Sequence, residues 1–283
     1  MRGFCYAHAI IILREIGKSI LKKQGNQHVA ITISVTNQKG GVGKTTTAVN
    51  LAYYLAKNNQ RTLLIDFDPQ GNATSGMGID KQDLRLTMAD VVMGHATLNQ
   101  ITQQTAYKNF AIAPATPYLA DTEVQLGQVE KRFSRLKSAI EEVDGDFDVI
   151  IVDNPPSLSL LTINGLVAAR YVLLPVQAEF YALEGLGQLL ETMKLVRKAM
   201  NPTLDLLGVL TTMMDSRTTL CSQVHEEIKK HFPGKVFNTV IPRNIRLAEA
   251  PSHGLPIGAY DRFSKGARAY KAFAKEVIGR VGI

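Results

Sequence analysis

A glycine- and lysine-rich run between a predicted strand and a predicted helix contains the residues best suited to chemistry. It reads NQKGGVGKTTT over residues 37–47 and follows an apolar stretch at 29–35. Glycines let successive backbone N–H groups face one anion, and the start of a helix adds partial positive charge. Lys44 is placed to reach β- and γ-phosphates, and the Thr45 hydroxyl to bind Mg²⁺. The sequence therefore predicts a site for nucleotide phosphates.

The run departs from the common phosphate-loop pattern G-x-x-x-x-G-K-[ST] at its first position. Gln38 stands where the first glycine would fall, and a second lysine, Lys39, follows it. A glycine-rich turn near a lysine is often only a turn, but the flanking elements and Thr45 in register favour phosphate binding. The common pattern does not explain Lys39.

Three carboxylates follow predicted strands and are expected at one edge of a sheet. Asp66 and Asp68 come after the apolar run 61–65, and Asp153 ends the run 147–152. Ligands of parallel α/β sheets bind at the carboxyl ends of the strands, and Mg²⁺ on phosphates takes one or two carboxylates. We expect Asp153 to hold Mg²⁺ through a bound water, and Asp66 to support the magnesium shell from the same side of the strand as Asp68. We expect Asp68 to orient an attacking water. The alternatives are a helix cap at Asp153 and a turn former at Asp68.

Strand-like and helix-like segments alternate from residue 29 onward. The apolar pattern predicts strands at 29–35, 61–65, 110–113, 147–152, 171–175, 204–212 and 236–241. It predicts helices at 45–56, 87–93, 120–143, 158–169, 182–200, 218–231 and 265–281. Strands separated by helices imply a mostly parallel, twisted sheet covered by helices on both faces. No linker divides the chain, so we expect one domain over 29–283.

Residues 1–28 do not share this pattern and are treated as an N-terminal extension. Apolar residues at 9, 12, 13, 16 and 20 fit an amphipathic helix. Basic residues follow the apolar run instead of preceding it, which argues against a secretory signal. A helical arm, a translation start assigned too far upstream and a weak surface anchor all remain open.

The distribution of charge and the cysteine content limit the kinds of partner and compartment to be expected. The net charge is +7, and residues 191–283 carry 15 Lys and Arg against 8 Asp and Glu, whereas residues 1–190 carry 17 of each. This asymmetry suggests a polyanion partner, with a merely basic soluble surface as the alternative. Cys5 and Cys221 form no C-x-x-C or disulfide framework, and no apolar run is long enough to span a bilayer. We therefore expect a cytoplasmic protein.

Five motifs together resemble the ParA/Soj family of chromosome- and plasmid-partition ATPases. They are KGGVGKTT at 39–46, LIDFDPQGNAT at 64–74, VDNPPSL at 152–158, PVQAEFYALEG at 175–185 and IPRNIRLAEAPSHG at 241–254. The resemblance covers residues 29 to about 280 and implies a P-loop NTPase of the deviant Walker A class. Asn154 departs from the family, which more often has a small residue there.

The resemblance implies a magnesium-dependent ATPase that is weak on its own and pairs when ATP is bound. In this family the signature lysine, here Lys39, reaches the nucleotide of the partner subunit, so that two ATP molecules lie within a homodimer. Catalysis would fall to Lys39, Lys44 and Asp68, and Glu179 would belong to the dimer face. The implied ATP-binding residues are Lys39, Gly40, Gly41, Val42, Gly43, Lys44, Thr45, Thr46, Pro242 and Asn244; those for magnesium are Thr45, Asp66 and Asp153.

The resemblance also implies that the ATP-bound dimer binds double-stranded DNA without sequence preference. The matching arginines are Arg217 and Arg246, and Arg243 is a further candidate. For each arginine alone, an exposed surface residue or an ion pair with Asp215 or Glu249 is the better explanation, but the arginines together with the charge asymmetry favour DNA binding. The alternative for Arg243 is that its backbone lines the adenine pocket with those of Pro242 and Asn244. The family implies a ParB-like centromere-binding partner that stimulates hydrolysis, and association with the nucleoid. The cargo could be a chromosome, a plasmid or a protein cluster.

Two other classes share the phosphate loop. A MinD-like positioning ATPase ends in a membrane-binding amphipathic helix, but Tyr270, Phe273, Val277 and Ile278 more often indicate core packing, so no stable membrane association is expected. An electron-transfer ATPase of the nitrogenase-iron-protein kind needs cysteines for a bridging cluster, and Cys221 is the only one in the relevant region.

Overall fold

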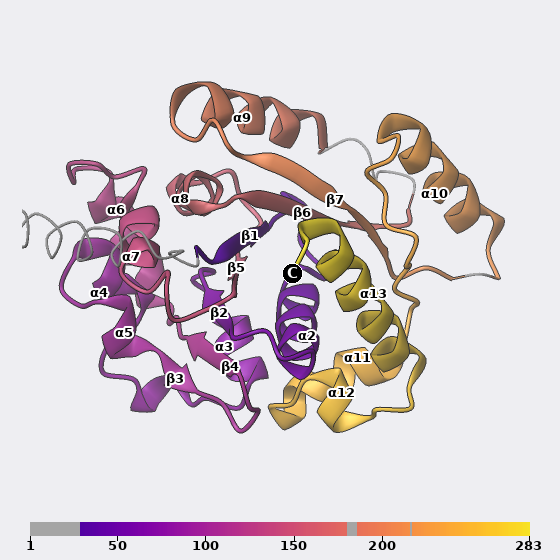
Figure 1. Ribbon diagram of the computed structural model, residues 1–283, viewed down its shortest axis with the longest axis horizontal. Helices are drawn as coiled ribbons and strands as arrows, with labels where there is room; N and C mark the ends of the chain where they lie inside the picture. The colour runs from indigo at the N-terminus through magenta and orange to yellow at the C-terminus, as the bar shows by residue number, and fades with distance from the viewer. Residues whose placement is uncertain (1–28, 180–185, 216) are drawn as a thin grey trace, which may run out of the picture.

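The computed structural model describes residues 29–179, 186–215 and 217–283, and within them the chain forms a seven-stranded sheet (Figure 1). The strand order is β3-β4-β2-β5-β1-β6-β7, and every described pairing is parallel except β3 with β4. The strands are β1 (Ile31–Val35), β2 (Thr62–Asp66), β3 (Gln103–Gln104), β4 (Phe110–Ala113), β5 (Val149–Asp153), β6 (Tyr171–Gln177) and β7 (Asp205–Thr212). This confirms the predicted mostly parallel sheet.

Helices cover both faces because alternate strand residues point to opposite sides and both sets are apolar. One face carries α2 (Lys44–Lys57) and α13 (Lys265–Val281), which pack against each other. The opposite face carries α4 (Met88–Met93), α6 (Tyr118–Leu126), α7 (Arg135–Glu141), α8 (Leu160–Ala168), α9 (Leu186–Ala199) and α10 (Thr219–His231). Shorter elements are α3 (Asn72–Gly76), η1 (Lys81–Asp83), α5 (Leu98–Ile101), α11 (Ile245–Glu249), η2 (Ala250–His253) and α12 (Ile257–Tyr260).

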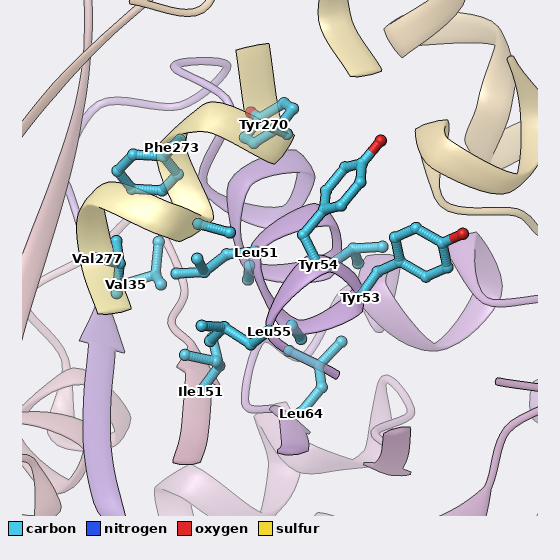
Figure 2. Packing of buried hydrophobic residues seen from close by; sticks show 14 of the residues in the cluster. Val35, Leu51, Tyr53, Tyr54, Leu55, Leu64, Ile151, Tyr270, Phe273 and Val277 are labelled. Carbon is cyan, nitrogen blue, oxygen red and sulfur yellow. The ribbon is translucent and has the colours of Figure 1, made fainter. Parts of the chain in front are cut away.

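The core under α2 and α13 fixes the helix that the phosphate loop opens (Figure 2). Leu51 and Leu55 of α2 are fully buried against strand residues such as Ile151, and Phe273 of α13 is buried beside them. Tyr270 of α13 donates or accepts a hydrogen bond with the Thr47 hydroxyl at 3.0 Å. The final helix is therefore part of the support of the phosphate loop.

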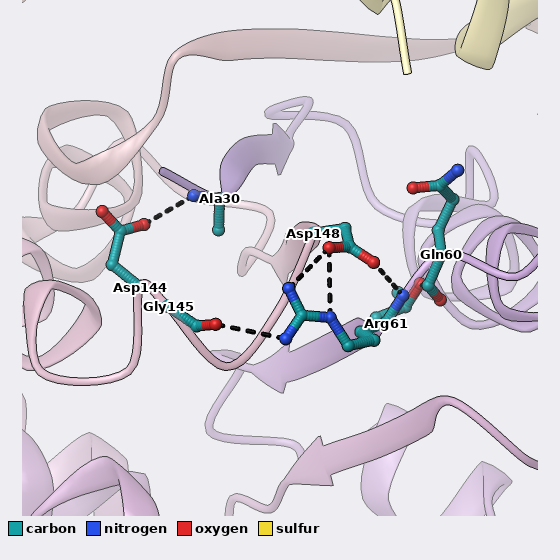
Figure 3. Close-up of polar contacts among 7 residues, drawn as sticks. Ala30, Gln60, Arg61, Asp144, Gly145 and Asp148 are labelled. Atoms are coloured by element: carbon teal, nitrogen blue, oxygen red, sulfur yellow. Dashed lines mark hydrogen bonds and ion pairs between the residues drawn. The ribbon is translucent and has the colours of Figure 1, made fainter. Parts of the chain in front are cut away.

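At the amino ends of the strands, polar contacts and not apolar packing join neighbouring segments (Figure 3). Asp148 accepts hydrogen bonds from the backbone N of Arg61 at 2.6 Å and from its guanidinium at 2.7 and 3.1 Å. Asp144 accepts one from the backbone N of Ala30 at 2.7 Å. The loop before β5 is thus bonded to the starts of both β1 and β2. These contacts align the three strands whose carboxyl ends form the candidate site.

Two predicted elements were wrong. The predicted helix 120–143 is two helices, because Asn164 of α8 binds the backbone at the break. It donates to Arg132 O of the intervening turn at 2.7 Å and accepts from Leu136 N in the first turn of α7 at 3.3 Å. The predicted strand 236–241 makes only isolated contacts with β7, since the backbone N–H groups of Asn238 and Thr239 donate to Glu276 of α13 at 2.8 and 3.0 Å. In both cases a tertiary side-chain contact replaces a regular backbone bond.

Replacing Asp148 by alanine should lower the free energy of unfolding by about 1–2 kcal/mol, because the Arg61 backbone and side chain lose their acceptor at a partly exposed site. Urea unfolding measures the change. The matched control is Glu191→Ala. Among the described residues its carboxylate pairs with the exposed Lys194 at 2.6 Å, and the substitution should change stability by less than about 0.5 kcal/mol. Equal effects of the two substitutions would contradict the role given to Asp148.

Candidate active site

The phosphate loop is held open at the carboxyl edge by the neighbouring strands. Asn37 donates from Nδ2 to Pro175 O of β6 at 2.8 Å, and Thr212 of β7 donates from its hydroxyl to Val42 O at 2.8 Å. Gly43 precedes α2 in the left-handed region, with φ 87°, which favours glycine. A side chain built on Gly40, Gly41 or Gly43 would meet no atom within 4 Å, so the backbone here faces open space. The loop has the form of an anion cradle.

Lys44 lies inside this cradle and not on the surface. Its side chain donates to Lys39 O at 3.0 Å, and the residue is only 6% exposed. Burial lowers the pKa of Lys44, while the charges of Asp153 and Asp68 act in the opposite direction. The ammonium therefore lies across the loop, where it feels the charges of both carboxylates. Its predicted contact with nucleotide phosphates stays a prediction.

Asp153 is sealed from solvent with no hydrogen-bond partner for either carboxylate oxygen among the described residues. It ends β5, and the sheet register places it beside Val35 and Asp66. Burial and the nearby charge of Asp66 raise its pKa well above the ordinary value, although the Thr45 hydroxyl and the Lys44 ammonium act to lower it. A buried carboxylate without a partner is costly, so this arrangement suits a cation that joins the site with its ligand.

Asp66 and Asp68 differ in their contacts. Asp66 is buried, and its Oδ2 accepts from the backbone N and the hydroxyl of Thr74 at 2.7 and 2.6 Å. Burial raises the pKa of Asp66 to about 6, despite these hydrogen bonds. Asp68 lies beyond the end of β2, and its Oδ1 accepts from Gln70 N at 2.9 Å. Asp68 is thus a turn former as well as a neighbour of the other two carboxylates. Support of a magnesium shell by Asp66 stays a prediction.

These residues fit a magnesium–nucleotide complex. The unpartnered oxygens of Asp153 and the neighbouring Thr45 hydroxyl are the oxygen ligands that Mg²⁺ takes, and the open glycines leave room for phosphates. The helix macrodipole of α2 and Lys44 supply positive charge at the same place.

A cavity of about 390 Å³ continues from the phosphate loop toward the C-terminal segment. Gly43 and Thr46 line one side, and Pro242 and Asn244 the other. Asn244 Oδ1 is buried without a hydrogen-bond partner among the described atoms. The cavity brings the two predicted groups of ATP-binding residues together and is suited to a nucleoside.

Lys39 lies outside the cradle and forms an ion pair with Glu179 of the same chain. Its side chain is 39% exposed, whereas Lys44 is buried. The two lysines of the loop are therefore in different surroundings, and Lys39 is accessible to another molecule.

The three predicted DNA-binding arginines are exposed, and two have carboxylate partners. Arg217 donates to Asp215 through Nε at 2.9 Å and Nη2 at 2.7 Å, and these bonds lower the pKa of Asp215. Arg246 donates to Glu249 at 2.9 Å. Arg243 is exposed, and its charge also acts to lower the pKa of Asp215. The ion pairs considered as the alternative are present, and DNA binding stays a prediction.

Sequence reasoning missed the residues that position this site. Asn37, Thr212 and Tyr270 hold its loops through hydrogen bonds to residues distant in the sequence. Thr74 binds Asp66 and also accepts from the distant Ala115 N at 3.0 Å. Asn154 was identified only as unusual. Its amide donates to Ser34 and to two backbone carbonyls, and a Cβ on the facing glycine of α8 would clash with its Oδ1. This explains how a larger side chain is accommodated beside Asp153.

Comparisons with known proteins identify the family of this chain. The chain matches the AAA domain model over residues 30–206. It is 54% identical over 245 residues to the sporulation initiation inhibitor protein Soj of Bacillus subtilis (strain 168), covering 87% of this chain and 97% of that protein. It is 45% identical over 258 residues to the chromosome partitioning protein ParA of Myxococcus xanthus, covering 91% of each. The chain belongs to the ParA/Soj family of P-loop ATPases.

Solved structures of similar fold contain nucleotide. Cobyrinic acid a,c-diamide synthase from Mycobacterium smegmatis, with bound ATP analog and magnesium, has a TM-score of 0.77 and 38% identity, covering 87% of this chain and 93% of that one. The septum site-determining protein MinD from Pyrococcus horikoshii, complexed with Mg-ADP, has a TM-score of 0.73 and 25% identity, covering 89% of this chain and 98% of that one.

No helix among the described residues is long and apolar enough to cross a membrane.

Replacing Asp153 by asparagine should stabilise the nucleotide-free protein at pH 8. Burial raises the native pKa values of Asp66 and Asp153 above the ordinary 3.8, so the native state holds protons that the unfolded chain has released. Stability therefore falls as pH rises from about 4 through the Asp66 pKa of about 6. Removing the charge should add about 1–3 kcal/mol at pH 8 and less near pH 4.

Urea unfolding at both pH values, without nucleotide or magnesium, tests this expectation. The exposed Asp83→Asn is the control and should show no comparable pH-dependent gain. An Asp153→Asn protein with unchanged pH dependence would show that the buried charge carries no such cost.

Proposed function

We propose that this protein is an ATP-dependent switch for DNA partition, which pairs and binds DNA when ATP is bound and is released by hydrolysis. The observation that carries the proposal is the buried, unpartnered Asp153 beside an open phosphate loop whose two lysines differ in exposure. Membership of the ParA/Soj family, several of whose relatives are named for chromosome partitioning, supports it.

Different residues of this chain have different roles in ATP binding and hydrolysis. Lys44 and the loop backbone neutralise and hold the β- and γ-phosphates, while Thr45 and Asp153 would hold magnesium. When bound, the magnesium ion neutralises phosphate charge and keeps the phosphates in one geometry. Asp68 orients the attacking water, since phosphoryl transfer depends on positioning and electrostatic stabilisation. Pro242 and Asn244 enclose the adenine.

Lys39 makes ATP binding a signal to pair. Its ion pair with Glu179 is partly exposed, and such pairs contribute only about 0–1 kcal/mol. A triphosphate on a second subunit offers several negative charges and stronger charge-assisted hydrogen bonds. Lys39 then exchanges Glu179 for the partner's phosphates, and the dimer depends on the γ-phosphate.

DNA binding would use Arg217, Arg243 and Arg246 on the exposed surface of the basic last third of the chain. Phosphate contacts need cations at suitable spacing and carry no sequence information, which fits a dimer that moves over the nucleoid. Each ion pair with Asp215 or Glu249 is on the surface and can be exchanged for a DNA phosphate.

The switch requires a partner that triggers hydrolysis, and we infer a ParB-like centromere-binding protein from the family. The protein would then work in the cytoplasm at the nucleoid, as a single ATPase domain over 29–283. Residues 1–28 lie outside the described residues and would act as an extension of that domain.

A MinD-like membrane role is less well supported. Tyr270, Phe273 and Val277 on the apolar face of α13 are buried in the core and are not available to lipid. Co-sedimentation with DNA and with liposomes, in the presence of ATP, separates the two roles. Retention on lipid alone would replace the partition proposal.

Substitution of the two lysines of the loop should impair different properties, ATP binding for Lys44 and dimerisation for Lys39. Lys44→Ala should weaken ATP binding at least ~100-fold, because a buried charge-assisted contact is lost. Lys39→Ala should bind ATP within a few-fold of wild type yet remain a monomer. Equilibrium nucleotide titration and light scattering with ATP measure these properties, with the exposed Lys108→Ala as control. A Lys39→Ala protein that dimerises normally would remove the proposed role of Lys39.

Arg246→Glu should remove most DNA binding while dimerisation with ATP persists. For the wild type, log affinity should fall with log salt by about 0.9 for each phosphate neutralised. Fluorescence anisotropy with unrelated DNA duplexes at several salt concentrations tests both statements. Arg85→Glu, an exposed arginine outside the three, is the control. Salt-independent binding would argue against an electrostatic site.

A further inference from the structure

The turn that carries Asp68 has one carboxylate oxygen fixed and one available. Asp68 Oδ1 accepts from Gln70 N at 2.9 Å, and Asp68 O accepts from Gly71 N at 2.8 Å. Within the described residues Oδ2 of Asp68 has no hydrogen bond. The direction of that oxygen is therefore set by the peptide units around Gln70.

Lys81 holds this turn from its far side. Its Nζ donates to Gln70 O at 2.6 Å. The same peptide unit that donates Gly71 N to Asp68 thus has its carbonyl fixed by Lys81, so it is held at both ends. A Cβ on Gly71, which has φ 60°, would lie 3.1 Å from Lys81 Cε and 2.7 Å from Ala115 O. The lysine stem packs directly over the turn.

Lys81 itself comes from a segment with its own anchors. Asp80 caps η1 by accepting from Gln82 N at 2.9 Å. The preceding turn packs backbone to backbone against η2, because a Cβ on Gly254 would lie 2.6 Å from Gly78 Cα. The ammonium is therefore presented by a segment that has contacts of its own with η2 and α3, besides its contact with the turn.

We propose that Lys81 is a positioning residue for ATP hydrolysis, which holds the Gln70 carbonyl so that Asp68 Oδ2 faces the attacking water. The inference rests on the role proposed above for Asp68. Lys81 acts on the rate of the chemical step and not on ATP binding, because its contact is with the Asp68 turn and not with the phosphate loop. A shift of the carboxylate by a fraction of an ångström is enough to slow a reaction that depends on positioning.

Steady-state hydrolysis by the full chain, with ATP, Mg²⁺ and duplex DNA, tests the proposal. Lys81→Met should lower kcat by roughly 10-fold and leave KM for ATP within about 2-fold, since misplacement affects the reacting groups and not binding. Lys81→Arg keeps a cationic donor and should restore most of kcat. Lys108→Met, which removes an exposed lysine elsewhere, should behave as wild type.

Two results would overturn the inference. One is a wild-type kcat for Lys81→Met. The other is a parallel loss of kcat, ATP affinity and thermal stability that Lys81→Arg does not restore, which would make the lysine only a structural contact. Asp68→Ala separates this inference from its premise: if it hydrolyses ATP normally, the role of Asp68 fails too. If Asp68→Ala is inactive while Lys81→Met is normal, only the role of Lys81 fails.

Discussion

The burial of three carboxylates with one ammonium is the constraint on which the rest of this structure depends. Asp66, Asp68 and Asp153 are all nearly inaccessible to solvent, and Lys44 is the buried cation beside them. The excess negative charge is costly in a medium of low polarity, as the raised pKa values of Asp66 and Asp153 indicate. A ligand that brings a cation relieves this cost, so its binding also stabilises the fold.

The parallel sheet is the reason that these groups meet. The register sets Asp66 beside Asp153, and the loop after β1 emerges next to both. Contacts at the opposite edge, between Arg61 and Asp148, secure that register without touching the site. The phosphate loop is in turn held by Asn37 and Thr212, so its glycines can stay open to a ligand. The stabilising contacts therefore surround the site, while the carboxylates within it keep a charge that no partner among the described residues balances.

The sequence predicted the parts of this arrangement that depend on local pattern. The α/β alternation, the final helix at 265–281 and the burial of its apolar face were confirmed, because periodicity and local charge determine them. The errors have one physical origin. Asn164 interrupts the predicted helix at 120–143, and Glu276 takes the backbone donors of the predicted strand at 236–241. The partners of Asn37 and Thr212 were missed for the same reason, since a polar residue does not indicate which distant carbonyl it will meet.

The cations proposed to act on other molecules share a property that the sequence analysis considered only for the arginines, as an alternative to DNA binding. Lys39, Arg217 and Arg246 each have a carboxylate of the same chain, in pairs that are exposed enough to contribute little stability. Lys44, by contrast, is buried and committed to the loop. A carboxylate partner keeps an exposed cation oriented while no phosphate is present. The several charges of a nucleotide triphosphate, or the closely spaced single charges of DNA phosphates, would displace it at small cost. The same exchange would serve both pairing through Lys39 and DNA binding through the arginines. In the proposed function, both events would then respond to the negative charge of phosphate groups.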